Sequence, residues 1–278
     1  MAEDFKKAEE KLQKLKAGLA SYGSVLVAYS GGVDSAFLLK VSYDVLGSKA
    51  VALTAKSPSL PEKELTEAVT LAKSIGVQHL IVNSNELTDP NYSSNPENRC
   101  YYCKTELYSI CTNKIKELGI NTIVDGFNKD DEGDYRPGRV AAKEHKVLSP
   151  LADAGLTKED IRWLSKDMGL PTWNKPNMAC LSSRFPYGTE ITKSNLKKVE
   201  LAEDYLKEMG FNQLRVRYFG DKASIELGKN EIPLYSNEIG QKVKSRFLEI
   251  GFDEVLLDPE GYRTGKLNDA ITSSNKTG

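Results

Sequence analysis

The chain has 278 residues, of which 40% are hydrophobic and 28% are charged, a composition typical of folded globular proteins and not of disordered or fibrous ones. Its Lys and Arg residues number 38 and its Asp and Glu residues 39, so a chain-wide basic field for a long nucleic acid is excluded. We therefore expect a small-molecule partner and no nucleic acid. The charged opening is unlike a secretory signal, and no apolar run approaches the roughly 18 residues of a membrane span. These features predict a cytoplasmic protein without a membrane segment.

Alternating strands and helices are predicted for the first part of the chain. Apolar residues at three- and four-residue steps predict a helix over residues 5–19, which Gly23 can end. Further helices are predicted at 36–46, 61–75, 103–118 and 158–167, and strands at 25–29, 50–54, 77–82 and 121–125. This alternation is typical of an α/β fold with a mostly parallel, doubly wound sheet, which binds ligands at the carboxyl ends of its strands. The irregular stretches 84–99 and 127–139 follow two of the strands, so we expect them to help to build a site at that edge.

The pattern changes after residue 191. Helices are predicted at 192–209 and 238–250, and short strands at 213–219, 223–227 and 254–257. Such a segment is a compact α+β unit. The loop around Pro186 and Gly188 suits a boundary, so the sequence predicts an α/β domain over 1–190 and a smaller α+β domain for substrate binding or oligomerisation over 191–278.

The turn between the first predicted strand and its helix has the sequence SGGVDS, residues 30–35. Its backbone amides and the helix N-terminus point at one spot, which favours an anion. The predicted cofactor-binding residues of this turn are Ser30, Gly31, Gly32, Asp34 and Ser35. Glycines allow close approach of phosphate oxygens, serine hydroxyls add donors, and the aspartate can hold Mg²⁺. A plain tight turn with a helix cap is the alternative.

No lysine follows Gly32, so the turn is not the usual P-loop of nucleotide triphosphatases. The six-residue string instead resembles the PP-loop of the N-type ATP pyrophosphatases. These enzymes cleave ATP between the α and β phosphates, release pyrophosphate and leave AMP on a substrate. The superfamily includes amide-forming ligases and sulfur-inserting enzymes.

Two of the four cysteines, Cys100 and Cys103, lie one turn apart at the start of a predicted helix, where the helix dipole favours thiolates and soft metal ligation. Cys180 is a third candidate, which the sequence alone does not bring near the other two. Cys111 shares a helix stripe with Leu107 and is predicted to lie in the core. Three cysteines could form a zinc site, a redox dithiol with a spare thiol, or a [4Fe-4S] cluster with one iron open to carry sulfide.

Longer motifs resemble the LarE family, which comprises ATP-dependent sulfur transferases for the nickel-pincer nucleotide cofactor of lactate racemase. The matching segments are VDGFNKDD at 124–131, DYRPGR at 134–139, CLSSRFPYG at 180–188, RVR at 215–217 and GYRTGKLND at 261–269. The resemblance runs from about residue 19 to residue 268. It implies that the carboxylates of a pyridinium-3,5-dicarboxylate mononucleotide are adenylated by ATP and converted to thiocarboxylates. It also implies a homo-oligomer, a hexamer in this family, and partners among the cofactor-pathway proteins.

Some members of the family spend one cysteine, at the position that matches Cys180, and keep dehydroalanine there. This chain also has Cys100 and Cys103, which resembles the cluster-containing branch. The resemblance thus implies ATP, Mg²⁺ and a [4Fe-4S] cluster as cofactors, with these three cysteines as cluster ligands and a catalytic rather than a sacrificial sulfur. A sacrificial Cys180 remains the alternative.

The predicted substrate ligands are Arg184, Arg215 and Arg217, because guanidinium groups bind phosphate and carboxylate bidentately. Arg215 and Arg217 lie two residues apart on a predicted strand and should face the same side. A solvent-exposed strand face with surface ion pairs would have the same sequence pattern and is the alternative. Gly126 is predicted to contact the cofactor. Asp131 and Glu132 suit either a metal or a plain acidic loop. The rival functions are a tRNA thiolase, an amide ligase and a nucleotide-sensing protein.

Overall fold

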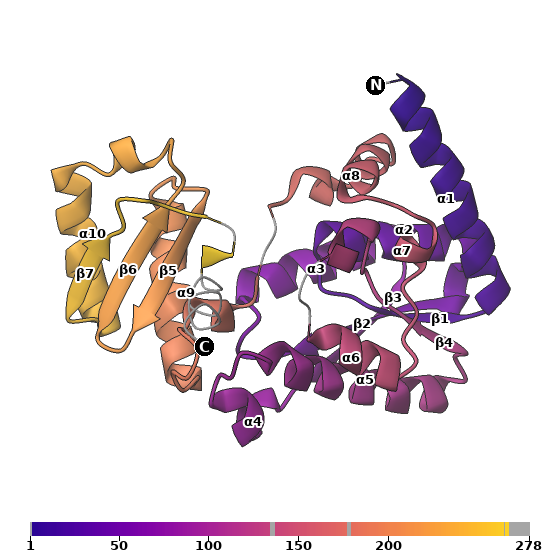
Figure 1. The fold of residues 1–278 in the computed structure, drawn as a ribbon, viewed down its shortest axis with the longest axis horizontal. Helices are drawn as coiled ribbons and strands as arrows, with labels where there is room; N and C mark the ends of the chain where they lie inside the picture. The colour runs from indigo at the N-terminus through magenta and orange to yellow at the C-terminus, as the bar shows by residue number, and fades with distance from the viewer. Residues whose placement is uncertain (1, 134–136, 177–178, 264, 267–278) are drawn as a thin grey trace, which may run out of the picture. The chain divides into compact units, whose positions relative to one another are not determined.

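The computed structural model describes residues 2–133, 137–176, 179–263 and 265–266 (Figure 1). The chain forms two compact units. The first comprises Met1–Glu86 and Asn98–Met178, and the second comprises Leu87–Glu97 and Ala179–Gly278. Cys180 and its loop therefore belong to the second unit, although the predicted boundary at 190/191 assigned them to the first domain. The functional division into 1–190 and 191–278 stays a prediction.

A parallel sheet forms the centre of the first unit. Its strand order is β3-β2-β1-β4 in the described residues, with β1 at Val25–Ala28, β2 at Ala50–Lys56, β3 at Gln78–Asn83 and β4 at Thr122–Val124. Val25 is in register with Ala50 on one side and Thr122 on the other. The predicted parallel α/β sheet is thus confirmed, and its central strand β1 is buried throughout.

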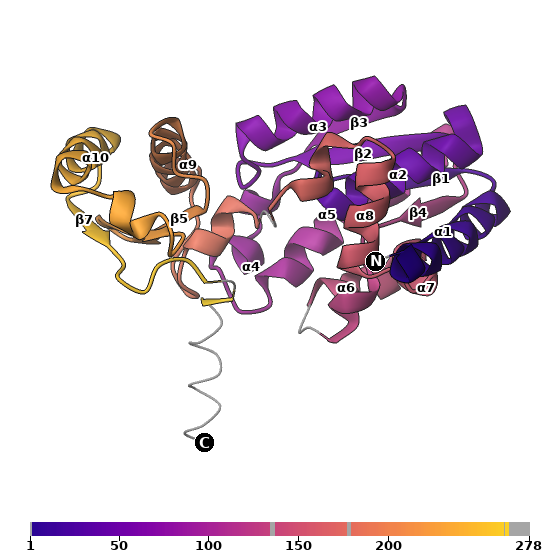
Figure 2. The same cartoon turned by 90° about the horizontal axis from the view of Figure 1, so that it is seen from above.

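Helices cover both faces of this sheet, as Figures 1 and 2 show. They are α1 (Ala2–Tyr22), α2 (Val33–Leu46), α3 (Glu62–Ile75), α5 (Arg99–Leu118), α6 (Gly138–Glu144), α7 (Pro150–Asp153) and α8 (Lys158–Asp167). Alternate residues of β1 enter two separate cores. Val25 and Val27 pack with α1, α2, α3, α7 and α8, whereas Leu26 and Ala28 pack with α5 and α6. Two-sided burial explains why β1 and the first four residues of β2 are continuous apolar runs, whereas β3 is only partly buried.

The second unit is a small mixed sheet with two long helices. It contains α4 (Pro90–Ser93), α9 (Lys193–Glu208), β5 (Leu214–Phe219), β6 (Lys222–Leu227), α10 (Asn237–Ile250) and β7 (Glu254–Leu257). β5 pairs antiparallel with β6, and β6 pairs parallel with β7. Val216 and Ile225 are fully buried, as are Val243 and Phe247 of α10. This is the predicted α+β appendage.

The helices α4, α6 and α7 lie where the sequence predicts irregular structure or no element. Each is seven residues or shorter in the described chain, so it lacks the repeated 3.6-residue apolar pattern that identifies a helix. The 3₁₀ turns are Gly47–Lys49, Glu86–Thr88, Lys129–Gly133, Pro171–Asn174, Leu181–Arg184 and Ile232–Leu234.

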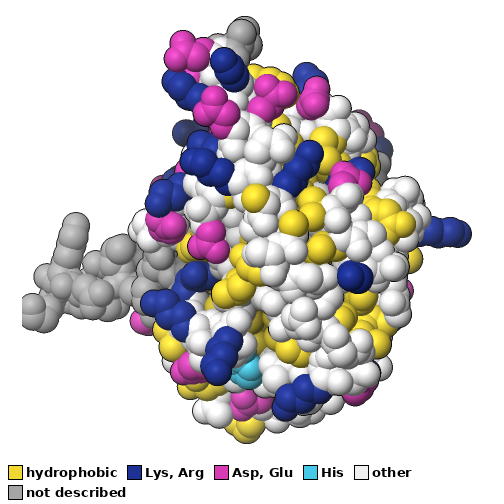
Figure 3. Space-filling model, turned by 90° about the vertical axis from the view of Figure 1, so that its right-hand side faces the viewer, with side chains coloured by type: hydrophobic (Ala, Val, Ile, Leu, Met, Phe, Trp, Pro, Cys, Tyr) yellow, Lys and Arg dark blue, Asp and Glu magenta, His cyan; other side chains and the backbone are white. Residues whose placement is uncertain are grey.

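Acidic and basic side chains are interspersed on the face of the molecule that Figure 3 shows. In the part of the chain that the structure describes, no helix is both long enough and apolar enough to span a bilayer.

Candidate functional site

The phosphate-loop sequence connects β1 to α2, as predicted, and its glycines are required by the local geometry. Gly31 has a φ of +76°, and a Cβ added there would lie 2.8 Å from the Cβ of Ala68 on α3. Gly32 is the N-cap of α2 and has no side-chain cap hydrogen bond. No side chain of the N-cap residue therefore occupies the N-terminus of α2, so its backbone N–H groups are accessible to an anion.

The two serines of the loop hold its shape. Their hydroxyl oxygens lie 3.0 Å apart, and the Ser35 hydroxyl donates to the carbonyl of Gly32 at 3.2 Å. The backbone N–H of Gly32 donates to the Ser30 hydroxyl at 3.4 Å. Ser35 is buried, whereas Ser30 is exposed. The hydroxyls thus organise the turn, and their contact with phosphate stays a prediction.

Gly126, the residue that the sequence assigns to the cofactor, lies against this loop. A Cβ at Gly126 would come within 2.9 Å of the backbone nitrogen of Ser35 and 3.2 Å of its Cα. Because these are rigid backbone atoms, any side chain at position 126 would displace the loop. The structure therefore brings the end of β4 against the PP-loop.

Asp34 lies in the first turn of α2, and its two carboxylate oxygens differ in their hydrogen-bond partners. Oδ2 accepts a hydrogen bond from Nζ of Lys158, the first residue of α8, at 2.6 Å. Oδ1 is buried and has no hydrogen-bond partner among the described residues. An unsatisfied carboxylate oxygen at a phosphate loop fits a divalent cation, as the sequence predicts for Asp34. The sequence does not predict a role for Lys158, whose local signal is its place at the start of a helix.

A buried network surrounds Asp125, directly after β4. Tyr108 donates to Asp125 Oδ2 at 2.9 Å, and Ser149 donates to Oδ1 at 2.7 Å. Arg139 donates to the Ser149 hydroxyl at 2.7 Å. Lys104, whose ammonium lies 5.5 Å from the Tyr108 ring centroid, has a pKa above its usual value because Tyr108, Asp125 and Cys103 favour its charged form although burial opposes it. This network, which the sequence did not predict, links the end of β4 to the cysteine helix.

The cysteines have different surroundings. Cys100 is exposed and Cys103 half-buried, both in the first turns of α5 as predicted. Cys111 is fully buried, which confirms its predicted place in the core, and burial raises the pKa of its thiol to about 12. Cys180 is exposed in the second unit, where it caps the 3₁₀ turn Leu181–Arg184. No group of three or more His, Cys, Asp or Glu side chains that could hold a metal ion occurs within the described ranges.

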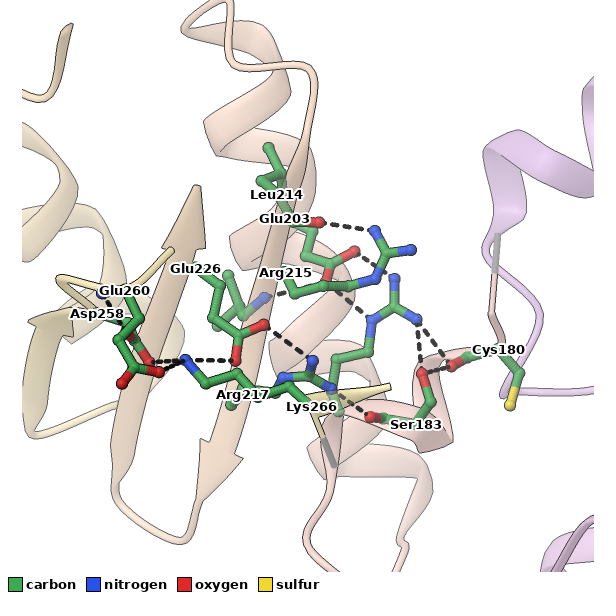
Figure 4. Close-up of polar contacts among 12 residues, drawn as sticks. Cys180, Ser183, Glu203, Leu214, Arg215, Arg217, Glu226, Asp258, Glu260 and Lys266 are labelled. Carbon is green, nitrogen blue, oxygen red and sulfur yellow. Dashed lines mark hydrogen bonds and ion pairs between the residues drawn. The ribbon is translucent and has the colours of Figure 1, made fainter. Parts of the chain in front are cut away.

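Arg184 is fully buried, and its hydrogen-bond partners Glu203 and Cys180 are labelled in Figure 4. Its Nε and Nη2 donate to the two carboxylate oxygens of Glu203, each at 2.9 Å. Its Nη1 donates to the carbonyls of Ala179 at 2.6 Å and Cys180 at 2.8 Å. The guanidinium therefore fixes the backbone under Cys180 while the thiol stays exposed.

Arg215 and Arg217 project from the same face of β5, as predicted (Figure 4), and both are buried. Arg217 donates to Glu226 at 2.9 Å and to the carbonyl of Ser183 at 2.7 Å. Arg215 donates to the carbonyl of Leu214 at 2.7 Å. Burial and repulsion from Arg184 lower the pKa of Arg215. A bound anion would offset the repulsion from Arg184, and anion binding by Arg215 stays a prediction.

The C-terminal motif contributes to the same unit. Gly261 has a φ of +71°, and a Cβ there would lie 2.5 Å from the carbonyl oxygen of Leu227. The N–H of Tyr262 donates to that carbonyl at 2.7 Å, and the Tyr262 ring lies 5.1 Å from the Arg215 guanidinium. The close turn thus places an aromatic ring beside the arginine. Residues 134–136, 264 and 267–269 of the predicted motifs lie outside the described residues.

Asp131 and Glu132 make their contacts within their own loop. Asp131 Oδ2 accepts from the N–H of Asn128 at 3.1 Å, and Glu132 pairs with Lys129 at 2.5 Å. These contacts suit an acidic turn, and a metal at this place stays a prediction. For the predicted site as a whole, the PP-loop and Gly126 come together in the first unit, while the three arginines and Cys180 come together in the second.

No family model matches the chain. An uncharacterized protein of Synechocystis sp. is 48% identical over 266 residues, which cover 95% of this chain and 99% of that protein. The pyridinium-3,5-bisthiocarboxylic acid mononucleotide synthase of Lactiplantibacillus plantarum is 37% identical over 264 residues, 94% of each chain. A more distant relative, the tRNA-specific 2-thiouridylase of Desulforamulus reducens, is 25% identical over 264 residues, which cover 78% of this chain and 66% of the relative.

The synthase of Lactiplantibacillus plantarum is similar to this chain over 94% of the length of each. The thiouridylase is similar at much lower identity. The resemblance that the motifs suggested is therefore confirmed: the chain belongs to the LarE family of PP-loop enzymes.

Proposed function

We propose that the chain uses ATP to convert the carboxylates of a pyridinium-3,5-dicarboxylate mononucleotide into thiocarboxylates, with release of pyrophosphate and AMP. The main support is the PP-loop geometry, in a chain 37% identical to a synthase of the bisthiocarboxylic acid mononucleotide. The loop offers a helix N-terminus, two glycines and a partly exposed aspartate whose buried Oδ1 has no hydrogen-bond partner among the described residues. Membership of this family makes the chain an ATP-dependent sulfurtransferase.

In the first half-reaction, a substrate carboxylate attacks the α phosphorus of ATP and pyrophosphate leaves. Negative charge develops on the phosphoryl oxygens, and the amides of residues 30–35 and the N-terminus of α2 are positioned to stabilise it. Asp34 is the residue that would hold Mg²⁺, through Oδ1. The ion, when bound, would neutralise phosphate charge.

In the second half-reaction, sulfur replaces the adenylate: a C–S bond forms, the C–O bond to AMP breaks, and a thiocarboxylate remains. Cys100, Cys103 and Cys180 are the proposed ligands of a [4Fe-4S] cluster. Three thiolates suit this group because they hold a cubane and leave one iron for an exchangeable sulfur. The exposure of Cys100 and Cys180 is consistent with ligation, since neither thiol is part of a core.

Arg215 and Arg217 are the proposed ligands of the substrate's phosphate or carboxylates. Arg184 was predicted to share this role. Its Nε, Nη1 and Nη2 already donate to Glu203 and to the Cys180 loop, so the contacts favour a role in supporting the sulfur-bearing loop. Assembly into a homo-oligomer, a hexamer as the resemblance implies, contact with cofactor-pathway proteins and a cytoplasmic location are part of the same proposal.

Pyrophosphate release tests the first half-reaction. We expect the purified protein to release pyrophosphate from Mg·ATP only when the mononucleotide dicarboxylate is present. Release without any carboxylate, or none with it, would contradict the proposal. Release that depends on tRNA in place of the mononucleotide would favour the thiolase function of the distant relative.

The mass of the protein after turnover tests the source of sulfur. With a reconstituted cluster, sulfide, ATP and substrate under anaerobic conditions, we expect more than one turnover per chain and an unchanged Cys180. If Cys180 is the sulfur donor, each chain works once and loses the mass of H₂S as dehydroalanine forms. Dehydroalanine at position 180 in active, cluster-loaded protein would overturn the catalytic-carrier proposal. Cys111→Ser is the control, because this buried thiol is assigned no role in sulfur transfer.

A further inference from the structure

A short segment between β3 and α5 is part of the second unit. Leu87–Glu97, which we call the α4 segment, belongs to that unit together with Ala179–Gly278. Its Tyr92 and Asn95 are buried, with exposures of 1% and 0%. A segment of this length is too short to form a core of its own. Its buried side chains are therefore held by the rest of the unit.

Tyr92 and Asn95 contact the turn that bears the exposed cysteine of this unit. The Tyr92 and Ser182 hydroxyl oxygens lie 2.7 Å apart, and both residues are buried. The Asn95 side-chain amide donates to the carbonyls of Phe185 at 3.3 Å and Pro186 at 2.7 Å. Both residues thus bind the α4 segment to the turn and to the residues directly after it.

Asn95 adopts a backbone conformation that these contacts stabilise. Its φ is +56°, in the left-handed region that is unfavourable for a residue with a Cβ. The Asn95 carbonyl accepts a hydrogen bond from the N–H of Gly188 at 2.9 Å, and the Ser93 carbonyl accepts one from the N–H of Ile191 at 2.8 Å. Such a conformation persists where the surrounding contacts over-determine it. The backbone of the α4 segment is therefore matched to the stretch that follows the turn.

The Cys180 turn takes its shape from side-chain donors. Several backbone carbonyls in this stretch accept hydrogen bonds from side chains. They belong to Ala179, Cys180, Ser183, Phe185 and Pro186. The donors are Arg184, Arg217 and Asn95, and Figure 4 shows the bond from Arg217 to Ser183. The thiol of Cys180 stays exposed above this fixed backbone. Group transfer benefits from such an arrangement, because it presents the reacting atom in one geometry.

Packing alone does not account for the polar contacts of the turn. Phe185 is fully buried, and its ring centroid lies 4.8 Å from that of Tyr218 on β5. This apolar contact already attaches the turn to the sheet of the unit. A buried hydrogen bond adds less net stability than the burial of an aromatic ring, but it selects one conformation. The contacts of Tyr92 and Asn95 therefore specify the conformation of the turn.

We propose that Tyr92 and Asn95 are positioning residues for sulfur transfer, which hold the turn that presents the Cys180 thiol. The inference rests on the proposed role of Cys180 in that reaction, and it applies to a cluster ligand and to a sulfur donor alike. Asn95 is also five residues before Cys100 in the sequence. The α4 segment thus leads directly from the residues that hold one proposed sulfur-transfer cysteine to the helix that bears another.

The test measures the turn and the two half-reactions separately in Tyr92→Phe and Asn95→Gly. The first variant removes only a hydroxyl, and the second has a residue that adopts a positive φ freely. Amide hydrogen exchange of the peptide 180–188, followed by mass spectrometry, should become at least about tenfold faster in both variants, because buried hydrogen bonds are lost. Exchange of β5 and β6 should stay unchanged. Thiocarboxylate formation should fall at least about tenfold, while pyrophosphate release should change less than about twofold.

Tyr235→Phe is the matched control, because it makes the same chemical change in the same unit. Tyr235 packs against Phe211, with ring centroids 6.2 Å apart. This variant should change neither the exchange of the turn nor thiocarboxylate formation. Ser182→Ala completes a double-mutant cycle with Tyr92→Phe. Since the two hydroxyls share one contact, the double variant should exchange less than about twofold faster than either single variant.

Faster exchange confined to the turn, with loss of sulfur transfer alone, would support the inference. Unchanged exchange of the turn in both variants, faster exchange throughout the second unit, or a parallel loss of pyrophosphate release would overturn it. Wild-type protein that forms no thiocarboxylate would instead contradict the proposed function. In that case the exchange measurement would still decide whether the α4 segment holds the turn.

Discussion

The phosphate loop and the arginine cluster are both proposed to bind anions, and they are built for it by different means. The loop is one contiguous segment whose donors are backbone amides, and its glycines are required by close contacts such as that of Gly31 with Ala68. The cluster takes Arg184, Arg215 and Arg217 from two separate segments and buries their guanidinium groups. Backbone sites need local geometry only, whereas buried side-chain sites need partners that balance their charge.

Both regions carry their own counter-charges. Asp34 is paired with Lys158 in the first unit, and Arg184 is paired with Glu203 in the second. The first pair is partly exposed and can exchange partners, while the second is sealed in the core, with side-chain exposures of 0% and 2%. We therefore expect ligands to rearrange the pair at the loop and to leave the Arg184 pair intact.

The largest expected effect follows from breaking the sealed pair. Glu203→Gln leaves the Arg184 charge buried without a counter-ion, so the free energy of unfolding of the second unit should fall by about 3 to 5 kcal/mol. Urea denaturation monitored by hydrogen exchange would assign the loss to this unit. Asp204→Asn is the control on the same helix, because Asp204 and its partner Lys207 are both partly exposed, and it should cost less than about 1 kcal/mol.

The same pair predicts a pH dependence. Burial opposes the charged form of Glu203, but the Arg184 guanidinium outweighs it and holds the pKa of this carboxyl below its usual 4.5. A lowered folded-state pKa stabilises the protein above pH 4.5, and this stabilisation is lost as the pH falls through the folded-state value. The difference in stability between wild type and Glu203→Gln should thus shrink below pH 4.5. A constant difference down to pH 3 would contradict the ion-pair explanation.

The contrast also explains how far the sequence could predict the molecule. The strands, the long helices and residues 30–35 of the phosphate loop follow from local patterns, and the structure confirms the fold. Arg215 and Arg217 on one strand face follow from two-residue alternation. The partners of Arg184 and Asp34 could not be predicted in this way. Glu203 lies 19 residues from Arg184 and Lys158 lies 124 residues from Asp34, and neither pair carries a local sequence signal. Only tertiary packing decides which of many charged residues become buried partners.

The next largest effect is expected from substitutions in the phosphate loop. Asp34→Asn and Ser35→Ala should each lower pyrophosphate release at least about tenfold with the fold intact, since one removes a metal ligand and the other the hydroxyl that holds the turn. Ser42→Ala on the same helix is the control, because its buried hydroxyl has no hydrogen-bond partner in the described chain. Unchanged release in both loop variants would remove the PP-loop from the reaction.

Arg215→Ala tests the side-chain site. It should raise KM for the mononucleotide about tenfold and KM for ATP less than about twofold, because its proposed partner is an anionic group of the substrate. Arg246→Ala removes an exposed pair with Glu249 in the same unit and should change neither constant. Equal increases in both KM values would instead assign Arg215 to the nucleotide triphosphate.

The smallest expected effect compares two helix caps of the same chemistry, one in each unit. Thr157 accepts a hydrogen bond from the Asp160 N–H at 3.2 Å, and Thr192 accepts one from the Asn195 N–H, also at 3.2 Å. Either threonine replaced by alanine should cost about 1 kcal/mol of stability, the usual value of an N-cap. Because Thr157 orders the turn that presents Lys158, Thr157→Ala should also weaken ATP binding a few-fold, whereas Thr192→Ala should leave it unchanged. Calorimetric titration of both variants with ATP decides the point: equal ATP affinities in the two would mean that the start of α8 contributes packing to the phosphate site and no ordered cation.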